Sequence, residues 1–418
     1  MNKPQLSILA VLLTSCFHSA QASESNGYIT ESGLKLVPIL DSRFEYNDNI
    51  GRYSDAKAPE SSSVFVLEPG ISVESDRGGN QYSVAYQLSS GTYLDSSDDN
   101  YIDHTLSTNN FIRLNSRNGV ALNYSYQYSH EERGTGLLAG DELSTATDEP
   151  VKFAIHNVNG TYVYGSEQAK GRVELTLGYE DREYKNYRDT QLPGIGRVST
   201  KHKDHRELSG ALAFYYRVMP ATSLIFEVDT IERRYDLNDP ITDLSQDSVD
   251  IFYLLGATWE ATGKTTGKLR LGLQDKSYDE STKEDFQGFS WDLDVIWKPV
   301  KHSTVTLSGA QRARDSDQGT VYYVDEKSLY AGWKHYWLNN FYSNLSVQLR
   351  DDDYSNSQRF GQQLKRDDEL FKSGINFGYE IFEHADISLG WNYENNDSSL
   401  ESNNYKQNVM FISANANF

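Results

Sequence analysis

Charged side chains recur at alternate positions in several segments of the second half of the chain. Six are basic and two acidic: Arg270, Asp292, Asp294, Arg312, Arg314, Lys334, Arg350 and Lys372. Alternation with apolar neighbours would place them on one face of a β-strand. Such a face can line a water-filled channel and contact what passes through it.

Two interpretations of these charges remain open. Further acidic candidates on the same face are Glu174, Glu227 and Asp229. A basic sector opposite an acidic sector would set up a field that selects or orients charged permeants. Alternatively, the charges pair with one another, solvate the wall and brace it, which requires no transport role.

Other reactive side chains give weaker patterns. The densest histidine cluster, His202-Lys203-Asp204-His205, lies in or beside a polar loop. Because no motif places a nucleophile beside a base, we predict no catalytic residues and no enzyme activity. The acidic runs 96–100 and 351–353 lack EF-hand spacing and are expected to be solvated loops, so no metal and no cofactor are predicted. Tyr215 and Tyr330 share the polar face and could stack against sugar rings, although most tyrosines are expected at membrane interfaces.

Composition indicates what kind of scaffold could hold these residues. Only 38% of the 418 residues are hydrophobic, yet the chain contains 29 Tyr, 17 Phe and 6 Trp, and its mean hydropathy is -0.64. A disordered chain would be poor in aromatic residues. A large membrane barrel accounts for both features, because alternate residues face water and lipid and aromatic girdles mark the interfaces. The net charge of -21 argues against a nucleic-acid partner.

The period of a β-sheet dominates from residue 35 onward. Leu269, Leu271 and Leu273, for example, alternate with Lys268, Arg270 and Gln274. Short polar turns are expected at 76–80, 115–119, 165–170, 220–221, 262–265, 299–302, 338–340 and 382–384. Longer loops are expected at 47–61, 95–100, 132–149, 185–204, 236–246, 279–285, 317–320, 355–365 and 396–402.

Eight turns and nine loops join 18 strands, and their alternation is typical of outer-membrane barrels. We therefore predict an all-β fold, a transmembrane antiparallel barrel of about 18 strands over residues 35–418, with both ends on the periplasmic side. The alternative is a soluble β-sandwich, whose strands would usually be shorter and would meet in an apolar core.

The two ends of the chain suggest a route to the bacterial outer membrane. Residues 1–22 have the features of a signal peptide, with a small-x-small cleavage site at Ala20 and Ala22. A lipobox-like sequence ending at Cys16 competes with that site, and residues 23–34 would form a short periplasmic segment. At the other end Ile412, Ala414, Ala416 and the terminal Phe418 share one parity, like the signal that the barrel insertion machinery recognises.

Short motifs through most of the chain resemble a known family. They are Pro38-Ile39-Leu40, Tyr46-Asn47-Asp48-Asn49-Ile50, Pro69-Gly70, Tyr93, Tyr101-Ile102-Asp103-His104, His130-Glu131-Glu132-Arg133-Gly134, Tyr235, Trp259-Glu260-Ala261-Thr262-Gly263-Lys264-Thr265-Thr266, Trp297-Lys298-Pro299 and Lys365-Arg366-Asp367-Asp368. In this order they resemble the β-barrel porin family of exopolysaccharide and capsule biosynthesis operons.

The resemblance implies an outer-membrane, porin-like channel associated with export of a surface polysaccharide. Expected partners are membrane lipid, lipopolysaccharide, the insertion machinery, the polysaccharide and periplasmic or inner-membrane export proteins. The alternative is a general or substrate-specific diffusion porin for small solutes such as sugars. Both functions fit the same barrel and differ only in the permeant.

Overall fold

The computed structural model describes residues 27–418 except 167, 193, 241, 262, 317–320, 356–357, 360–361 and 364. Ala20, Ala22, Cys16 and the rest of the predicted leader lie outside these residues.

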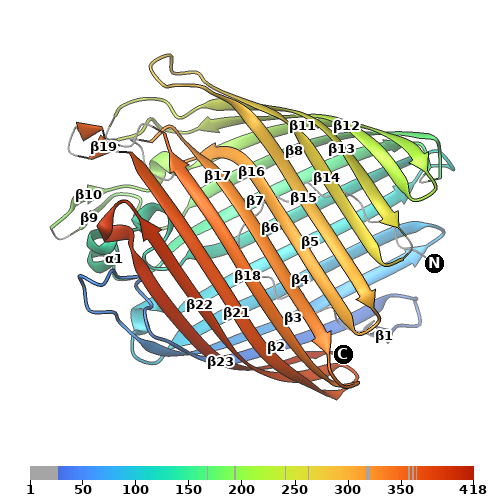
Figure 1. The fold of residues 1–418 in the computed structure, drawn as a ribbon, viewed down its shortest axis with the longest axis horizontal. Helices are drawn as coiled ribbons and strands as arrows, with labels where there is room; N and C mark the ends of the chain where they lie inside the picture. The colour runs from blue at the N-terminus through green and yellow to red at the C-terminus, as the bar shows by residue number, and fades with distance from the viewer. Residues whose placement is uncertain are drawn as a thin grey trace.

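The described residues form one closed antiparallel barrel of 18 strands (Figure 1). The strands are β2 (Lys35–Asn47), β3 (Ser62–Arg77), β4 (Asn80–Tyr93), β5 (Tyr101–Arg113), β6 (Asn118–Glu131), β7 (Val151–Tyr164), β8 (Gly171–Tyr184), β11 (His205–Met219), β12 (Thr222–Tyr235), β13 (Ser248–Ala261), β14 (Thr265–Tyr278), β15 (Phe286–Val300), β16 (Ser303–Asp315), β17 (Tyr323–Tyr336), β18 (Phe341–Tyr354), β21 (Arg366–Phe382), β22 (Ala385–Ser398) and β23 (Tyr405–Asn417). Strand β2 closes the barrel by pairing with both β3 and β23. The predicted fold class is confirmed.

Connections alternate between short turns and long loops, as the sequence predicts. The start of β2 and the end of β23 lie with the short turns, whereas the long loops extend from the opposite end (Figure 1). In the turn between β3 and β4, Gly78 and Gly79 have φ angles of 63° and 83°. A two-residue hairpin turn whose twist matches that of the flanking strands requires two successive positive φ angles. Glycine adopts such angles without steric cost.

Small elements occupy the chain ends and the loops. The two-residue strand β1 (Tyr28–Ile29) pairs with the start of β2, within the segment predicted to be periplasmic. The loops hold η1 (Ser97–Asp99), η2 (Gly136–Leu138), α1 (Asp141–Ala146), η3 (Lys201–Lys203), η4 (Glu401–Asn403) and the hairpins β9–β10 (Thr190–Leu192, Gly196–Val198) and β19–β20 (Gln358–Arg359, Gln362–Gln363). None of the helices in the described part of the chain is long and apolar enough to cross a membrane.

The register separates two faces of the wall. On β14, Leu271 and Leu273 are 44% and 55% exposed on the outer surface, whereas the side chains of Gln274 and Lys276 are fully buried on the inner side. Apolar residues outside and polar residues inside are the arrangement that a lipid-embedded barrel requires. The outer face includes Met410, Ile412 and the terminal Phe418, at the parity that the sequence indicates.

Candidate functional site

The eight charged residues singled out in the sequence lie on the inner face of six strands. Strand pairing aligns them around the lumen: Arg270 is opposite Asp292, Arg312 opposite Glu326, and Lys372 opposite Gln348. Asp294 is on β15, Arg314 on β16, Lys334 on β17 and Arg350 on β18.

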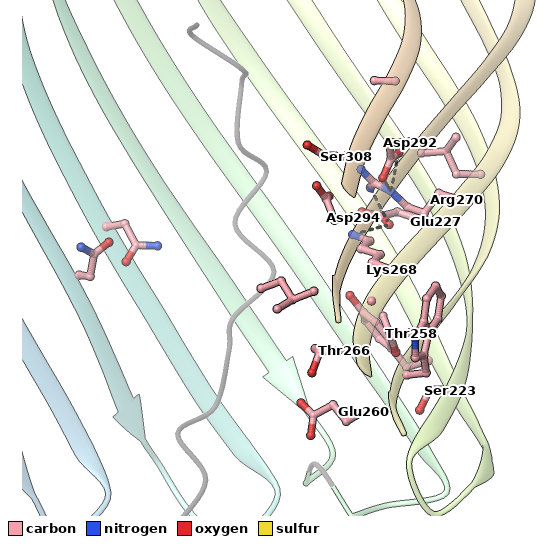
Figure 2. A pocket seen from close by; sticks show the side chains of 18 of the residues that line it. Ser223, Glu227, Thr258, Glu260, Thr266, Lys268, Arg270, Asp292, Asp294 and Ser308 are labelled. Atoms are coloured by element: carbon pink, nitrogen blue, oxygen red, sulfur yellow. Dashed lines mark hydrogen bonds and ion pairs between the residues drawn. The ribbon is translucent and has the colours of Figure 1, made fainter. Parts of the chain in front are cut away.

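The lumen contains a cavity of about 1600 Å³ toward the end with the short turns (Figure 2). Turn residues such as Gln168 and Pro220 line it together with residues of the wall. Five of the eight charged residues line it: Arg270, Asp292, Asp294, Arg312 and Arg350. This cavity is the candidate site.

Arg270 lies among carboxylates from two other strands. Its Nη1 is 2.9 Å from Oε2 of Glu227 and 3.7 Å from Oδ2 of Asp229, both on β12, and its Nε is 2.9 Å from Oδ2 of Asp292. Lys268 Nζ approaches the same Glu227 oxygen at 3.8 Å (Figure 2). The acidic and basic side chains are therefore interleaved on neighbouring strands, and they do not form opposed sectors. Interleaving places opposite charges a few ångströms apart, where their Coulomb attraction is stronger than it would be across the lumen.

Most of the other basic side chains on the lumen face also have acidic partners. Arg314 is 2.8 Å from Glu326 and 3.0 Å from Asp352, Arg350 is 3.3 Å from Asp352, and Lys372 is 2.8 Å from Glu394. Lys334 instead places its ammonium 4.3 Å from the ring centroid of Tyr342. Neither Arg312 nor Lys334 has a carboxylate of the described residues within 4.0 Å, but of the two only Arg312 lines the cavity. It is the basic residue of the set best placed to attract an anion.

Uncharged polar side chains line the wall formed by β4 to β7 and part of β18 to β23. Ser83, Asn109, Asn123 and Gln348 contribute to the cavity. Several of these groups bond to one another across strands, as in Asn123 Nδ2 to Asn159 Oδ1 at 3.0 Å and Asn344 Nδ2 to Asn376 Oδ1 at 2.9 Å. Amides and hydroxyls both donate and accept hydrogen bonds, so this wall can exchange partners with neutral polar solutes.

The two tyrosines proposed for sugar stacking both line the cavity. Tyr330 is 39% exposed, whereas Tyr215 is buried, with the guanidinium of Arg172 4.3 Å from the centroid of its ring. Tyr330 is therefore the more accessible aromatic surface of the two.

The loop between β6 and β7 folds against the inner wall. Leu138 from this loop packs in a buried apolar cluster with Phe153, Ile155 and Tyr184, whose strand positions face the lumen. Burial of these side chains holds the loop inside the barrel outline. The sequence did not show whether a loop narrows the channel, because the loop residues carry no periodic pattern.

The loop between β2 and β3 joins this inward-folded loop. Ser54 donates from its backbone N–H to Asp141 at 2.8 Å, and Ser144 Oγ donates to the carbonyl of Gly51 at 2.7 Å. The buried guanidinium of Arg52 pairs with Glu132 of the loop between β6 and β7 and lies 3.7 Å from the lumen-facing Glu394. The two loops together narrow the end of the lumen opposite the short turns.

These contacts have clear electrostatic consequences for the two loop residues. Burial alone would lower the pKa of Arg52, but Glu132 and Glu394 hold it well above its ordinary value. The positive charge of Arg52 lowers the pKa of Glu132 to about 2. The pair therefore stays charged throughout the physiological pH range.

Comparison with known proteins gives a family and a group of structural relatives. The sequence profile of the family described as Putative beta-barrel porin 2 matches residues 34–418. No curated protein matches the sequence. Among solved structures, the chain is similar to vanillate-bound OpdK of Pseudomonas aeruginosa (11% identity, 92% of this chain and 99% of that chain, TM-score 0.47). It is also similar to OpdO of the same organism (13%, 92% and 97%, 0.45) and to the siderophore receptor PirA of Acinetobacter baumannii (9%, 91% and 80%, 0.46).

Proposed function

The chain belongs to the Putative beta-barrel porin 2 family, and on this premise we propose that it is an outer-membrane diffusion channel for small, hydroxyl-rich solutes of the sugar class. That it is a porin-like outer-membrane channel follows from family and fold. The identity of the permeant is the proposal.

The observation that carries the proposal is the chemistry of the cavity wall. Its uncharged part offers side-chain amides and hydroxyls, including those of Ser83, Asn109 and Asn123. A sugar presents hydroxyl groups that donate and accept, so each contact with water can be replaced by a contact with the wall. The charges of Arg270 and Arg314 are balanced by neighbouring carboxylates, which reduces their pull on charged solutes.

The size of the lumen supports small solutes. The cavity of about 1600 Å³ exceeds the volume of sites that enclose one drug-sized ligand, roughly 300–1,000 Å³. A mono- or disaccharide can therefore enter and leave it without being enclosed. The loops that hold Ser54 and Leu138 narrow the opposite end and would set an upper limit on solute size.

Sugar flux into liposomes containing the purified folded barrel tests this proposal. Replacing the lumen-facing Asn109 and Asn123 with Leu is expected to slow entry of glucose and maltose several-fold, while small-ion conductance changes little. Thr108→Leu is the matched control, because Thr108 is the neighbour of Asn109 on β5 and faces outward. Equal rates for neutral sugars and for similarly sized non-hydroxylated solutes in the wild type would contradict the proposal.

Export of a surface polysaccharide is the second candidate function. It is favoured by the turn residues, such as Gln168 and Pro220, that line the cavity, because a polymer coming from the periplasm would enter at the end with the short turns. If this function is correct, an in-frame deletion strain loses surface polysaccharide and retains its precursors in the cell. Normal surface polymer together with lost uptake of a small sugar would instead support the diffusion channel.

A further inference from the structure

Three potential metal ligands converge on the lumen face of two neighbouring strands. They are Glu180 on β8 and His205 and Glu207 on β11, and one ligand atom of each lies within 4.8 Å of the others. Strands β8, β11 and β12 are adjacent in the wall (Figure 1). The three residues are outside the cavity described above.

Strand register brings the two carboxylates face to face. Glu180 is the direct cross-strand partner of Glu207, and His205 lies two residues before Glu207 on the same face. Two like charges directly opposite each other destabilise a sheet. A divalent cation between them would remove that repulsion.

His205 is oriented to use one particular ring nitrogen. Its Nδ1 lies 2.8 Å from the backbone carbonyl of Lys203. Because a carbonyl only accepts hydrogen bonds, Nδ1 carries the hydrogen, and the neutral ring keeps its lone pair on Nε2. Nε2 lies 3.5 Å from Oε1 of Glu207, on the side where the carboxylates converge. Such a hydrogen bond from the other ring nitrogen is how proteins orient a metal-binding histidine.

Each carboxylate also has one oxygen held by a partner. Arg233 on β12 donates Nε to Oε1 of Glu207 at 2.6 Å, and its Nη2 approaches the same oxygen at 2.6 Å. Asn157 on β7 donates to Oε2 of Glu180 at 3.1 Å. Within the described part of the chain, the second oxygen of each carboxylate has no hydrogen-bond donor, which leaves it available as a ligand.

We propose that Glu180, His205 and Glu207 bind a divalent transition-metal ion such as Zn²⁺ on the lumen wall. One imidazole nitrogen and two carboxylate oxygens form a mixed set that suits zinc and its first-row neighbours better than Ca²⁺ or Mg²⁺. Lys203, Arg233 and Asn157 orient the three ligands from outside. Three protein ligands leave a coordination position open for water or for a metal-chelating solute in the lumen.

The test uses the folded full-length barrel in detergent, without a polyhistidine tag. Titration calorimetry with ZnCl₂ is expected to show one tight site per barrel. His205→Ala and Glu180→Gln should abolish it or weaken it more than tenfold, and Asn157→Ala should weaken it roughly 10–100-fold through lost orientation. His130→Ala is the control, because His130 pairs with the single carboxylate of Asp103.

Cobalt spectroscopy provides a readout that does not depend on comparing affinities. His205→Cys should still bind Co²⁺ and should add a thiolate-to-metal charge-transfer band that the wild type lacks. Heat-modifiable gel mobility verifies that each variant is folded. A folded wild type that binds no zinc would overturn the proposal, as would a folded His205→Ala protein that binds zinc like the wild type. These outcomes are independent of whether sugars permeate.

Discussion

The side-chain amide of Gln274 on β14 makes two hydrogen bonds to the backbone of Ala313 on β16, donating to its carbonyl and accepting from its N–H, both at 2.8 Å. β15 lies between these strands, but its pairing with β16 begins only at Trp291 and Gln311. Gln274 is opposite Gly288 of β15, which has no side chain to obstruct it. The backbone ladder between β15 and β16 is therefore missing at this end of the two strands, and the side-chain amide of Gln274 supplies the hydrogen bonds that a peptide group of β15 would make.

Gln274→Leu is expected to destabilise the barrel because it leaves a buried backbone donor and acceptor without partners. An unsatisfied buried group costs about 1–3 kcal/mol, so the loss should be about 2 kcal/mol or more. The urea midpoint of the folded band on cold gels measures it. Gln87→Leu, on the lumen face of β4, is the control and should shift the midpoint little. Equal midpoints for the two variants would show that the side-chain hydrogen bonds of Gln274 do not contribute to the stability of the barrel.

Arg270 and Arg312 should respond differently to the same substitution. Arg270→Met leaves Glu227, Asp229 and Asp292 without their shared cation, and removing one partner of a poorly solvated ion pair costs up to roughly 3–5 kcal/mol. Arg312→Met should leave stability within about 0.5 kcal/mol, because no carboxylate in the described part of the chain lies within 4.0 Å of Arg312. It should shift reversal potentials toward cation selectivity, since a fixed positive charge is lost from the lumen.

Urea midpoints and planar-bilayer reversal potentials distinguish the two effects. A large stability loss in Arg312→Met, or none in Arg270→Met, would contradict the assignment of paired and unpaired charges. An unchanged reversal potential in Arg312→Met would show that this residue lies away from the ion pathway.

The sequence is sufficient to predict the strands of the barrel wall and insufficient to predict the contacts that loops and side chains make inside the barrel. Alternation fixes which side of β14 bears Arg270, because a period of two leaves only two faces and lipid excludes one of them. Turn residues such as Gly78 and Gly79 mark the strand ends through their backbone preferences. The contact of Arg52 with Glu394 has no such local signature, since the two residues are some 340 positions apart in sequence. It depends on closure of the barrel, which places β22 two strands from β2, and on how the loop after β2 folds. The same holds for Glu180 and His205, whose proximity follows from register and not from spacing along the chain.

The pair Arg52–Glu132 predicts how the loops respond to pH. The pKa of Glu132 in the folded protein is about 2, below its ordinary value of 4.5. A lowered carboxylate pKa contributes stability that is fully present above the unfolded value and is lost as the pH falls through the folded value. Single-channel conductance should therefore be steady from pH 7 to about pH 4 and should change below about pH 3 as the loop is released.

Glu132→Gln should show the low-pH conductance already at pH 7. Asp98→Asn, which changes an exposed carboxylate in another loop, should behave like the wild type. A wild-type conductance that changes with a midpoint near 4.5 would contradict the pairing, because that is where an unperturbed glutamate titrates.

Deletion of the terminal Phe418 is expected to impair assembly of the barrel. Phe418 follows β23, the strand that closes the barrel on β2, and its backbone N–H donates to the carbonyl of Pro38 at 3.0 Å. Its side chain is 59% exposed on the outer face, in line with Ile412 and Met410. An exposed aromatic side chain at this end contributes little to packing within the barrel. We therefore expect its main role in recognition by the insertion machinery.

If Phe418 acts mainly in recognition, its deletion should affect assembly in cells but not refolding of the purified protein. In cells, the deletion should lower the amount of heat-modifiable, folded barrel in the outer membrane several-fold, whereas refolding of the purified variant into detergent should proceed nearly as for the wild type. Asn417→Ala is the control, because it changes the adjacent residue and retains the terminal aromatic ring. Normal folded yield in cells would exclude Phe418 as an assembly signal. A failure confined to refolding in detergent would instead assign the residue to barrel closure through its contact with Pro38.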